Sequence, residues 1–336
     1  METNDARGRT DPARRRVVLA AAAIMAGIGS GTAAAQDWPS KPIRLIVPFP
    51  AGTGTDVLGR MLAASLADAL GQGVVVDNRT GAAGTLGADA VAKAAADGYT
   101  LLLGQTIPNA IAPFAMPFIP YKADAFTPIG FIGSLYNVLV VPASLGVDSV
   151  ADFVALVKSK PGYYSYSSSG IGSTHHLAAI QFLSMHGLSM THVPYKGSTQ
   201  ALPDMLSGQI AMRFDTVPPV LSSIQSGRLK ALAISADQRV SSLPQVTTFK
   251  EAGIASVNAV NWYCLLGPRD MPKPMTSRLN ALVVRAVADP QFQRKLEPQG
   301  FVPGAPMTPE QLAAFLTTEQ TRFAKIVKEL DITVRE

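Results

Sequence analysis

Three polar loops could bind a small anion, and each follows a predicted strand. Residues 48–56 (PFPAGTGTD) come after an apolar run and open a helix. Residues 167–174 (SSSGIGST) repeat this arrangement with hydroxyls in place of charges, and Asp215-Thr216 ends a third strand. Glycines let the backbone approach a ligand, and the free N–H groups at a helix start attract anions. Because open parallel sheets bind ligands beyond the carboxyl ends of their strands, these loops favour one shared binding site.

Each loop also has a purely structural interpretation. Thr55 or Asp56 could simply cap the helix that follows, and Asp215 could cap a helix beginning near Val217. A serine-rich loop is often only a solvated turn. The binding hypothesis depends on similar loops occurring in two halves of the chain, not on any single one.

Several other kinds of chemistry lack their motifs. The Gly52–Gly54 run has no third glycine and no ribose-binding acid, so it is not a dinucleotide fingerprint, and the chain contains no P-loop and no Gly-x-Ser-x-Gly elbow. The histidines show no ligand-like spacing with cysteine or acids, so we expect no metal and no cofactor. A secreted hydrolase or lyase using Asp215 or His175 is the alternative, and a ligand-sensing partner of a membrane kinase would share the binding chemistry.

The composition describes a globular protein of two domains. The chain has 336 residues, of which 47% are hydrophobic and 16% charged, against a usual charged share of about 25%. This excludes a disordered or coiled-coil protein. The lone Cys264 excludes an intrachain disulfide framework and any CxxC site.

Residues 1–35 have the pattern of a signal peptide. Arg14–Arg16 precede an apolar run over 17–28, and Ala33–Ala35 provide a cleavage site. The run is short for a membrane span of about 20 residues, so a retained anchor is the alternative. Arg15-Arg16 also has twin-arginine character, which leaves the export route open. The formal net charge of +5 falls when this segment is removed, which does not favour nucleic acid binding.

The mature chain alternates predicted strands and helices. Strands are expected at 43–47, 74–76, 99–103, 138–141, 164–166, 191–193, 210–214, 229–234 and 262–266. Helices are expected at 56–70, 88–96, 150–158, 174–186, 199–206, 217–226, 276–287, 290–296 and 309–330. This order predicts parallel sheets with helices on their faces. The last helices have no sheet of their own, so the chain should cross twice between two α/β lobes, near 133–140 and 255–262.

Several segments closely resemble one known family. They are WPSKPIRLIVPF (38–49), VDNRTGAAG (76–84), DGYTLLLG (97–104), HVPYKG (192–197), Phe214-Asp215 and GRLKALA (227–233). In order and spacing these resemble the Bug family, the TctC-like solute receptors of tripartite tricarboxylate transporters. The resemblance runs from Trp38 to the final helix.

The resemblance implies an α/β fold of the type II periplasmic binding protein class. Lobe 1 would comprise 36–135 plus 261–336, and lobe 2 would comprise 136–260. It implies a monomeric periplasmic receptor that captures a small carboxylate in the cleft between the lobes, without catalysis, for uptake across the inner membrane. Its partners would be that ligand and the membrane components of a transporter.

The resemblance also assigns ligand-binding residues. In lobe 1 they are Phe49, Ala51, Gly52, Thr53, Thr55, Asp56, Gln105 and Thr106. In lobe 2 they are Ser168, Ser169, Gly170, Ser173, Thr174, His175, Tyr195, Lys196 and Asp215. Two positions depart from the family pattern, because Thr53 replaces a usual glycine and His175 precedes the usual histidine. Both could alter the choice of ligand.

The signal peptide hypothesis can be tested directly. Protein recovered from the periplasm should begin near Gln36, because cleavage is expected after Ala35. Intact-mass spectrometry measures the N-terminus. Exported protein that still carries residues 1–35 would contradict cleavage and support an anchor.

Overall fold

The computed structural model describes residues 38–195, 197–254, 257, 260–330 and 332. The predicted signal peptide and Lys196 lie outside the described residues. From Lys41 onward the chain forms one compact unit, which contains two separate β-sheets. In the described part of the chain, no helix combines the length and the apolarity that crossing a membrane requires.

The first sheet has six strands in the order β11-β4-β10-β3-β1-β2. Their bounds are β1 Ile43–Val47, β2 Val74–Asn78, β3 Thr100–Gln105, β4 Phe126–Leu135, β10 Asn261–Pro268 and β11 Phe301–Pro303. Strand β1 is parallel to both β2 and β3, whereas β10 is antiparallel to β3 and β4. The apolar run of β1 is buried at four of its five positions, as expected for a strand covered on both faces.

Helices from both ends of the chain cover this sheet. They are α2 Gly54–Leu70, α3 Thr85–Ala92, α4 Ala112–Ala115, α9 Lys273–Ala288, α10 Pro290–Leu296 and α11 Pro309–Glu329. A single π-helical turn at Ile107–Ile111 precedes α4. Helices α9 and α11 pack on β4, and α9 also packs on α2. The prediction that the late helices return to the first α/β unit is therefore confirmed.

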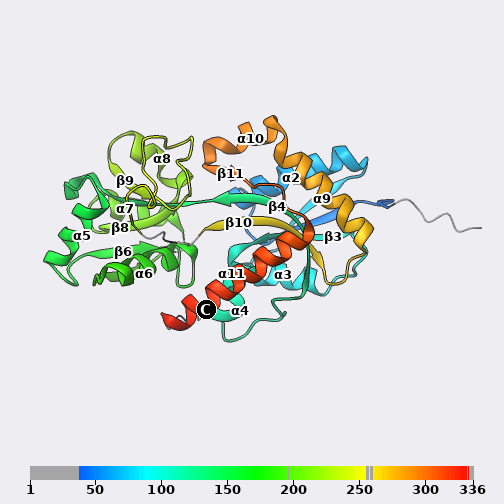
Figure 1. Ribbon diagram of the computed structural model, residues 1–336, viewed down its shortest axis with the longest axis horizontal. Coiled ribbons are helices and arrows are strands. Elements are labelled where there is room, and N and C mark those ends of the chain that lie inside the picture. Colours follow the sequence, from blue (N-terminus) through cyan, green and yellow to red (C-terminus); the bar gives the residue numbers. More distant parts are fainter. Residues whose placement is uncertain (1–37, 196, 255–256, 258–259, 331, 333–336) are drawn as a thin grey trace, which may run out of the picture. The chain divides into compact units, whose positions relative to one another are not determined.

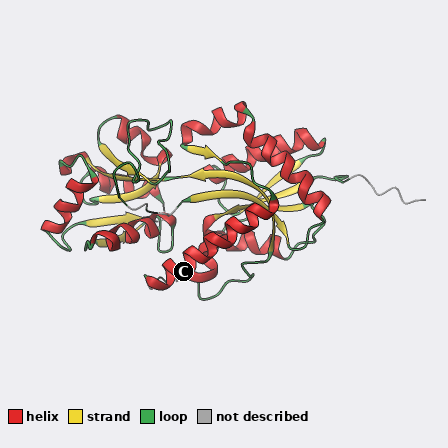
Figure 2. Cartoon of the chain, viewed as in Figure 1, coloured by secondary structure: helices red, strands yellow, loops and turns green. Residues whose placement is uncertain are grey.

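The second sheet has five strands in the order β7-β6-β8-β5-β9. Their bounds are β5 Asn137–Pro142, β6 Ser165–Ser168, β7 Thr191–Pro194, β8 Met212–Thr216 and β9 Leu229–Ile234. Its helices are α5 Val150–Ser159, α6 Thr174–His186, α7 Ser198–Leu206 and α8 Val217–Gln225. Figure 2 shows helices packed around the strands of both sheets.

Two segments connect the sheets. Strand β4 ends at Leu135 and β5 begins at Asn137, so the chain passes from the first sheet to the second with one intervening residue. It returns before β10, which begins at Asn261 and lies beside β4 (Figure 1). The end of β4 and the start of β5 fall within the range 133–140 that the sequence predicted for the first crossing.

The sheets are mixed: β1, β2 and β3 are parallel, as their strand–helix order predicts, but other strands are antiparallel to their neighbours. Strand β10 runs against β3 and β4, and β5 runs against β8 and β9. Strand β11 is also antiparallel to β4. Strands β5 and β10 each follow a crossing, so each enters its sheet from the other sheet and not from a helix of its own. The strands β4 and β11 and the helical turns over 107–115 were not predicted.

Candidate functional site

The polar loops of the two sheets meet at one cavity of about 540 Å³. Loops after β1 and β3 line it from the first sheet, and the loop after β6 lines it from the second. Eight predicted binding residues contribute to its lining: Phe49, Gly52, Thr55, Gln105, Ser169, Ser173, Thr174 and His175. Gly54 and Thr216, which belong to the predicted loops, also line it, as do Ile107, Pro218, Asn261 and Tyr263, which the sequence did not single out. Among the described lining residues there is no lysine, arginine, aspartate or glutamate.

The other predicted residues do not line this cavity. Those within the described part of the chain are Ala51, Thr53, Asp56, Thr106, Ser168, Gly170, Tyr195 and Asp215. Most of them hold the loops in place through hydrogen bonds within the protein. Lys196 lies outside the described residues.

Asp56 supports the first loop from inside. Its carboxylate accepts hydrogen bonds from the backbone N–H of Gly52 (2.9 Å), Nδ2 of Asn78 (2.9 Å) and Nε of Arg60 (3.0 Å). Burial raises the pKa of Asp56, but the hydrogen bonds from these three residues outweigh burial and leave that pKa below its usual value. The loop's glycine amide is therefore used internally, and Thr53 caps α2 by accepting from the backbone N–H of Asp56.

Gln105 forms the polar wall on the first sheet. Its Nε2 donates to Oγ1 of Thr55 (3.3 Å) and to the phenol oxygen of Tyr263 (3.2 Å). The backbone N–H of Gln105 donates to Oδ1 of Asn109 at 2.9 Å, which fixes the turn after β3. Its buried Oε1 has no hydrogen-bond partner among the described residues. Burial raises the pKa of Tyr263, so this phenol stays protonated.

A buried arginine that the sequence analysis missed lies behind the serine loop. Arg213 in β8 is fully buried, and its Nε donates to Oδ2 of Asp215 at 2.6 Å. Its Nη2 donates to Oγ of Ser169 (2.7 Å) and of Ser198 (3.0 Å), and its Nη1 donates to Oγ of Ser167 (3.3 Å). The alternation of side chains along a strand places residues 213 and 215 on one face, and this spacing could have revealed the pair.

Asp215 is committed to this network and does not face the cavity. It is fully buried, and its Oδ1 accepts from the hydroxyl of Ser198 (2.7 Å) and from the backbone N–H of Thr216 (2.8 Å). With Arg213 on its other oxygen, its hydrogen-bonding capacity is largely filled. The carboxylate therefore balances the buried guanidinium and does not bind an anion itself.

His175 connects this network to the cavity. Its Nδ1 lies 2.9 Å from Oγ of Ser169, and its Nε2 lies 3.6 Å from Oδ1 of Asp215. Burial, helped by the positive charge of the nearby Arg213, lowers the pKa of His175 to about 4. The carboxylate of Asp215 acts in the opposite direction but is outweighed. The imidazole is thus neutral at pH 7, so the described residues of the lining carry no charge.

The order Ser169, His175, Asp215 looks like that of a hydrolase triad, but its electrostatics differ. A triad carboxylate stabilises the imidazolium that forms when histidine accepts the serine proton. Here Arg213 already neutralises Asp215, and a histidine with a pKa of about 4 is a poor general base near pH 7. Within the described ranges, no cluster of ligating side chains could hold a metal ion.

Two threonines attach the loops to the crossing strands. Thr174 Oγ1 donates to Oδ1 of Asn261 at 2.8 Å, and Nδ2 of Asn261 donates to Oδ1 of Asn137 at 3.5 Å. Asn261 and Asn137 are the first residues of β10 and β5. Thr106 Oγ1 donates to the carbonyl of Val260 (2.9 Å) and accepts from the backbone N–H of Trp262 (2.8 Å).

The remaining lobe 2 residues shape the loop from behind. Ser168 is buried, and its hydroxyl lies 2.8 Å from Nε2 of His192. The same hydroxyl accepts a hydrogen bond from the backbone N–H of Gly170. Tyr195 donates its hydroxyl to Asp204, and burial together with that carboxylate raises the pKa of Tyr195 to about 12.

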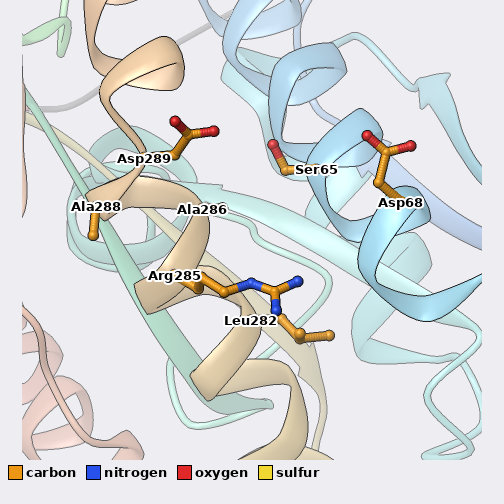
Figure 3. A pocket seen from close by; sticks show the side chains of 7 residues that line it. All are labelled: Ser65, Asp68, Leu282, Arg285, Ala286, Ala288 and Asp289. Atoms are coloured by element: carbon orange, nitrogen blue, oxygen red, sulfur yellow. The ribbon is translucent and has the colours of Figure 1, made fainter.

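A hollow of about 490 Å³ lies elsewhere, between α2 and α9 (Figure 3). Ser65 and Asp68 face it from α2, and Arg285 reaches into it from α9. It lies on the helical layer and has no strand-end loop in its lining. The cavity beside Ser169 and Gln105 is therefore the candidate functional site.

The chain crosses twice between two α/β lobes, whose strand-end loops enclose a polar cavity that the described residues leave uncharged. This arrangement defines a ligand-binding receptor. The chain belongs to the family described as the tripartite tricarboxylate transporter family receptor, TctC, whose model matches residues 58–332. Receptors of this family are periplasmic. The family and its structural neighbours are ligand-binding receptors, and this chain is accordingly a receptor and not an enzyme.

Individual relatives agree with this assignment. Protein BugT of Bordetella pertussis is 38% identical over 315 residues, which cover 93% of this chain and 95% of BugT. The structure of R. palustris Rpa4515 with adipate has a TM-score of 0.77 and 34% identity, covering 88% of this chain and 99% of that one. MatC from Rhodopseudomonas palustris with bound malate has a TM-score of 0.73 and 29% identity, covering 86% and 100%.

The Arg213–Asp215 pair can be tested by a pair of substitutions. Arg213→Met should lower the free energy of unfolding by about 3–5 kcal/mol, because it leaves a buried carboxylate without its cation. The double variant Arg213→Met/Asp215→Leu should recover most of that loss. Urea denaturation measures both. A double variant no more stable than Arg213→Met would contradict the pairing.

The neutral histidine predicts a pH dependence. The folded-state pKa of His175, about 4, lies below the usual 6.5, so the unfolded chain binds the proton more readily between these values. The free energy of unfolding should therefore fall as pH drops from about 6.5 to about 4, by up to about 3 kcal/mol from this group. His175→Asn keeps an acceptor near Ser169 and should make this fall shallower. Urea denaturation at a series of pH values measures the free energy of unfolding of both proteins. If it falls equally steeply as pH drops in the two, the assignment is contradicted.

Proposed function

We propose that this protein binds one small carboxylate in the cavity between its lobes and delivers it to the membrane components of a tripartite tricarboxylate transporter. One observation carries the proposal. Hydroxyl and amide groups from both lobes, including those of Thr55, Gln105, Ser169 and Asn261, line a single cavity in which the described residues carry no charged side chain.

Such a lining suits an anion for physical reasons. Helices α2 and α6 begin at this cavity, and the partial positive charge of a helix N-terminus favours a negative ligand there. Arg213 stands directly behind Ser169 and orients its hydroxyl. Because Asp215 balances this arginine, the site can bind a carboxylate and release it without a strong ion pair to break.

The predicted binding residues divide into two roles in this proposal. The eight that line the cavity would contact the ligand directly. The others within the described residues, such as Asp56, Thr106 and Asp215, would hold the loops in place. Structures of neighbours with adipate and malate support the carboxylate class.

The location and assembly of the protein follow from the same proposal. The signal peptide over 1–35 would direct a monomeric protein to the periplasm. The lobes would comprise 36–135 plus 261–336 and 136–260, and the end of β4, the start of β5 and the start of β10 support these bounds.

A thermal-shift screen tests the function. A carboxylate at a hundredfold excess over its dissociation constant should stabilise the protein by about 2.7 kcal/mol, a rise of about 5–10 °C in melting midpoint. Neutral sugars should give no rise. Ser169→Ala should weaken the best carboxylate about ten- to a hundredfold, since it removes a hydrogen bond to an anion.

Lys230→Ala is the matched control, because Lys230 pairs with Asp148 at the end of β9 remote from the cavity. It should leave affinity unchanged. Stabilisation by sugars but not by carboxylates would overturn the proposal.

A further inference from the structure

A second, smaller cavity of about 160 Å³ adjoins the binding cavity. The two share Phe49, Ile107, Ser169 and Ser173 in their linings. The small cavity continues past these residues to Ile111 and Met116 of the first lobe and to Ile171 of the second. We call it the apolar annex, after the side chains of Phe49, Ile107, Ile111, Met116 and Ile171.

The annex offers little to a charged group. None of the described residues in its lining is ionisable. Of its two serines, Ser173 is engaged, since it donates to the carbonyl of Gly170 and accepts from the backbone N–H of His176, while Ser169 is shared with the polar cavity. A carboxylate placed beyond Ser169 would lose its water without gaining a partner, which is strongly unfavourable.

The annex has the size of a small apolar group. Its volume of about 160 Å³ is comparable to an apolar protein cavity of about 150 Å³ that holds benzene. A ring or a short alkyl chain would therefore fill it while the carboxylate stays among the polar loops next door.

Ile171 supports the same conclusion independently. Ile171 is 47% exposed and lies between Gly170 and Gly172, which both have positive φ. These glycines allow the backbone to turn and present Ile171 at the rim of the annex. An apolar ligand end would cover this exposed side chain.

We propose that the ligand of this receptor is a monocarboxylate with an apolar far end, an alkanoate or arylalkanoate, in preference to a di- or tricarboxylate. This inference rests on the proposed function and narrows its ligand class. The carboxylate occupies the polar cavity beside Ser169 and Gln105, and the apolar end occupies the annex.

Matched ligands test the inference by titration calorimetry on the wild-type protein. Affinity should rise about fourfold for each methylene added from butanoate to hexanoate, the gain expected for burying one CH₂. Hexanoate should bind more tightly than adipate, which has the same chain length but a second carboxylate. Adipate binding as tightly as hexanoate or more tightly would overturn the inference and leave the proposed function intact.

Two variants test whether the apolar end of the ligand binds in the annex. Ile171→Asn should weaken hexanoate about three- to tenfold and leave adipate little changed, since it replaces an apolar contact by a polar one. Phe118→Asn is the control, because Phe118 is 81% exposed and lies outside both linings. Equal effects of the two variants would overturn the annex assignment. Failure of every carboxylate to bind would overturn the proposed function and this inference together.

Discussion

The buried ion pair between Arg213 and Asp215 is the constraint on which the second lobe's binding surface depends. A guanidinium removed from water is tolerated only if its donors find acceptors, and here three serine hydroxyls and a carboxylate provide them. These bonds fix Ser167 and Ser169 at the end of β6 and Ser198 at the start of α7. One charged pair thus holds the loops of three elements and presents a neutral surface to the cavity.

The first lobe achieves the same result with a different charge. Asp56 is nearly buried and gathers the amide of Gly52 and the side chains of Asn78 and Arg60 around one carboxylate. In both lobes an ionic group lies behind the loop and neutral groups face the ligand. The threonines Thr106 and Thr174 then attach each loop to residues at the ends of the crossing strands, so a change at the cavity can reach those strands.

Most elements of the fold could be predicted from local patterns in the sequence. The cap of α2, expected at Thr55 or Asp56, is instead Thr53. The β-branched run of β1 was predictable because it depends on nearby residues, and the crossings followed from the late helices having no sheet of their own. The reversed direction of β5 and β10 was not, since pairing between distant strands leaves no local signal. The same limit applies to the candidate site. The loops after strands could be located from the sequence, but Asp56 and Asp215 could not be recognised as internal supports. That distinction depends on Arg60, Asn78 and Arg213, which become their partners only in the folded chain.

Thr53 and His175, the two departures from the family pattern, have different physical roles. Thr53 does not line the cavity; its hydroxyl donates to the carbonyl of Pro50 and caps α2, so it stiffens the first loop. His175 lies in the lining between Ser169 and Asp215. Because burial keeps this histidine neutral, it adds a polar wall without adding charge. The difference that can reach a ligand directly is therefore at His175, whereas Thr53 acts through the shape of the loop that it caps.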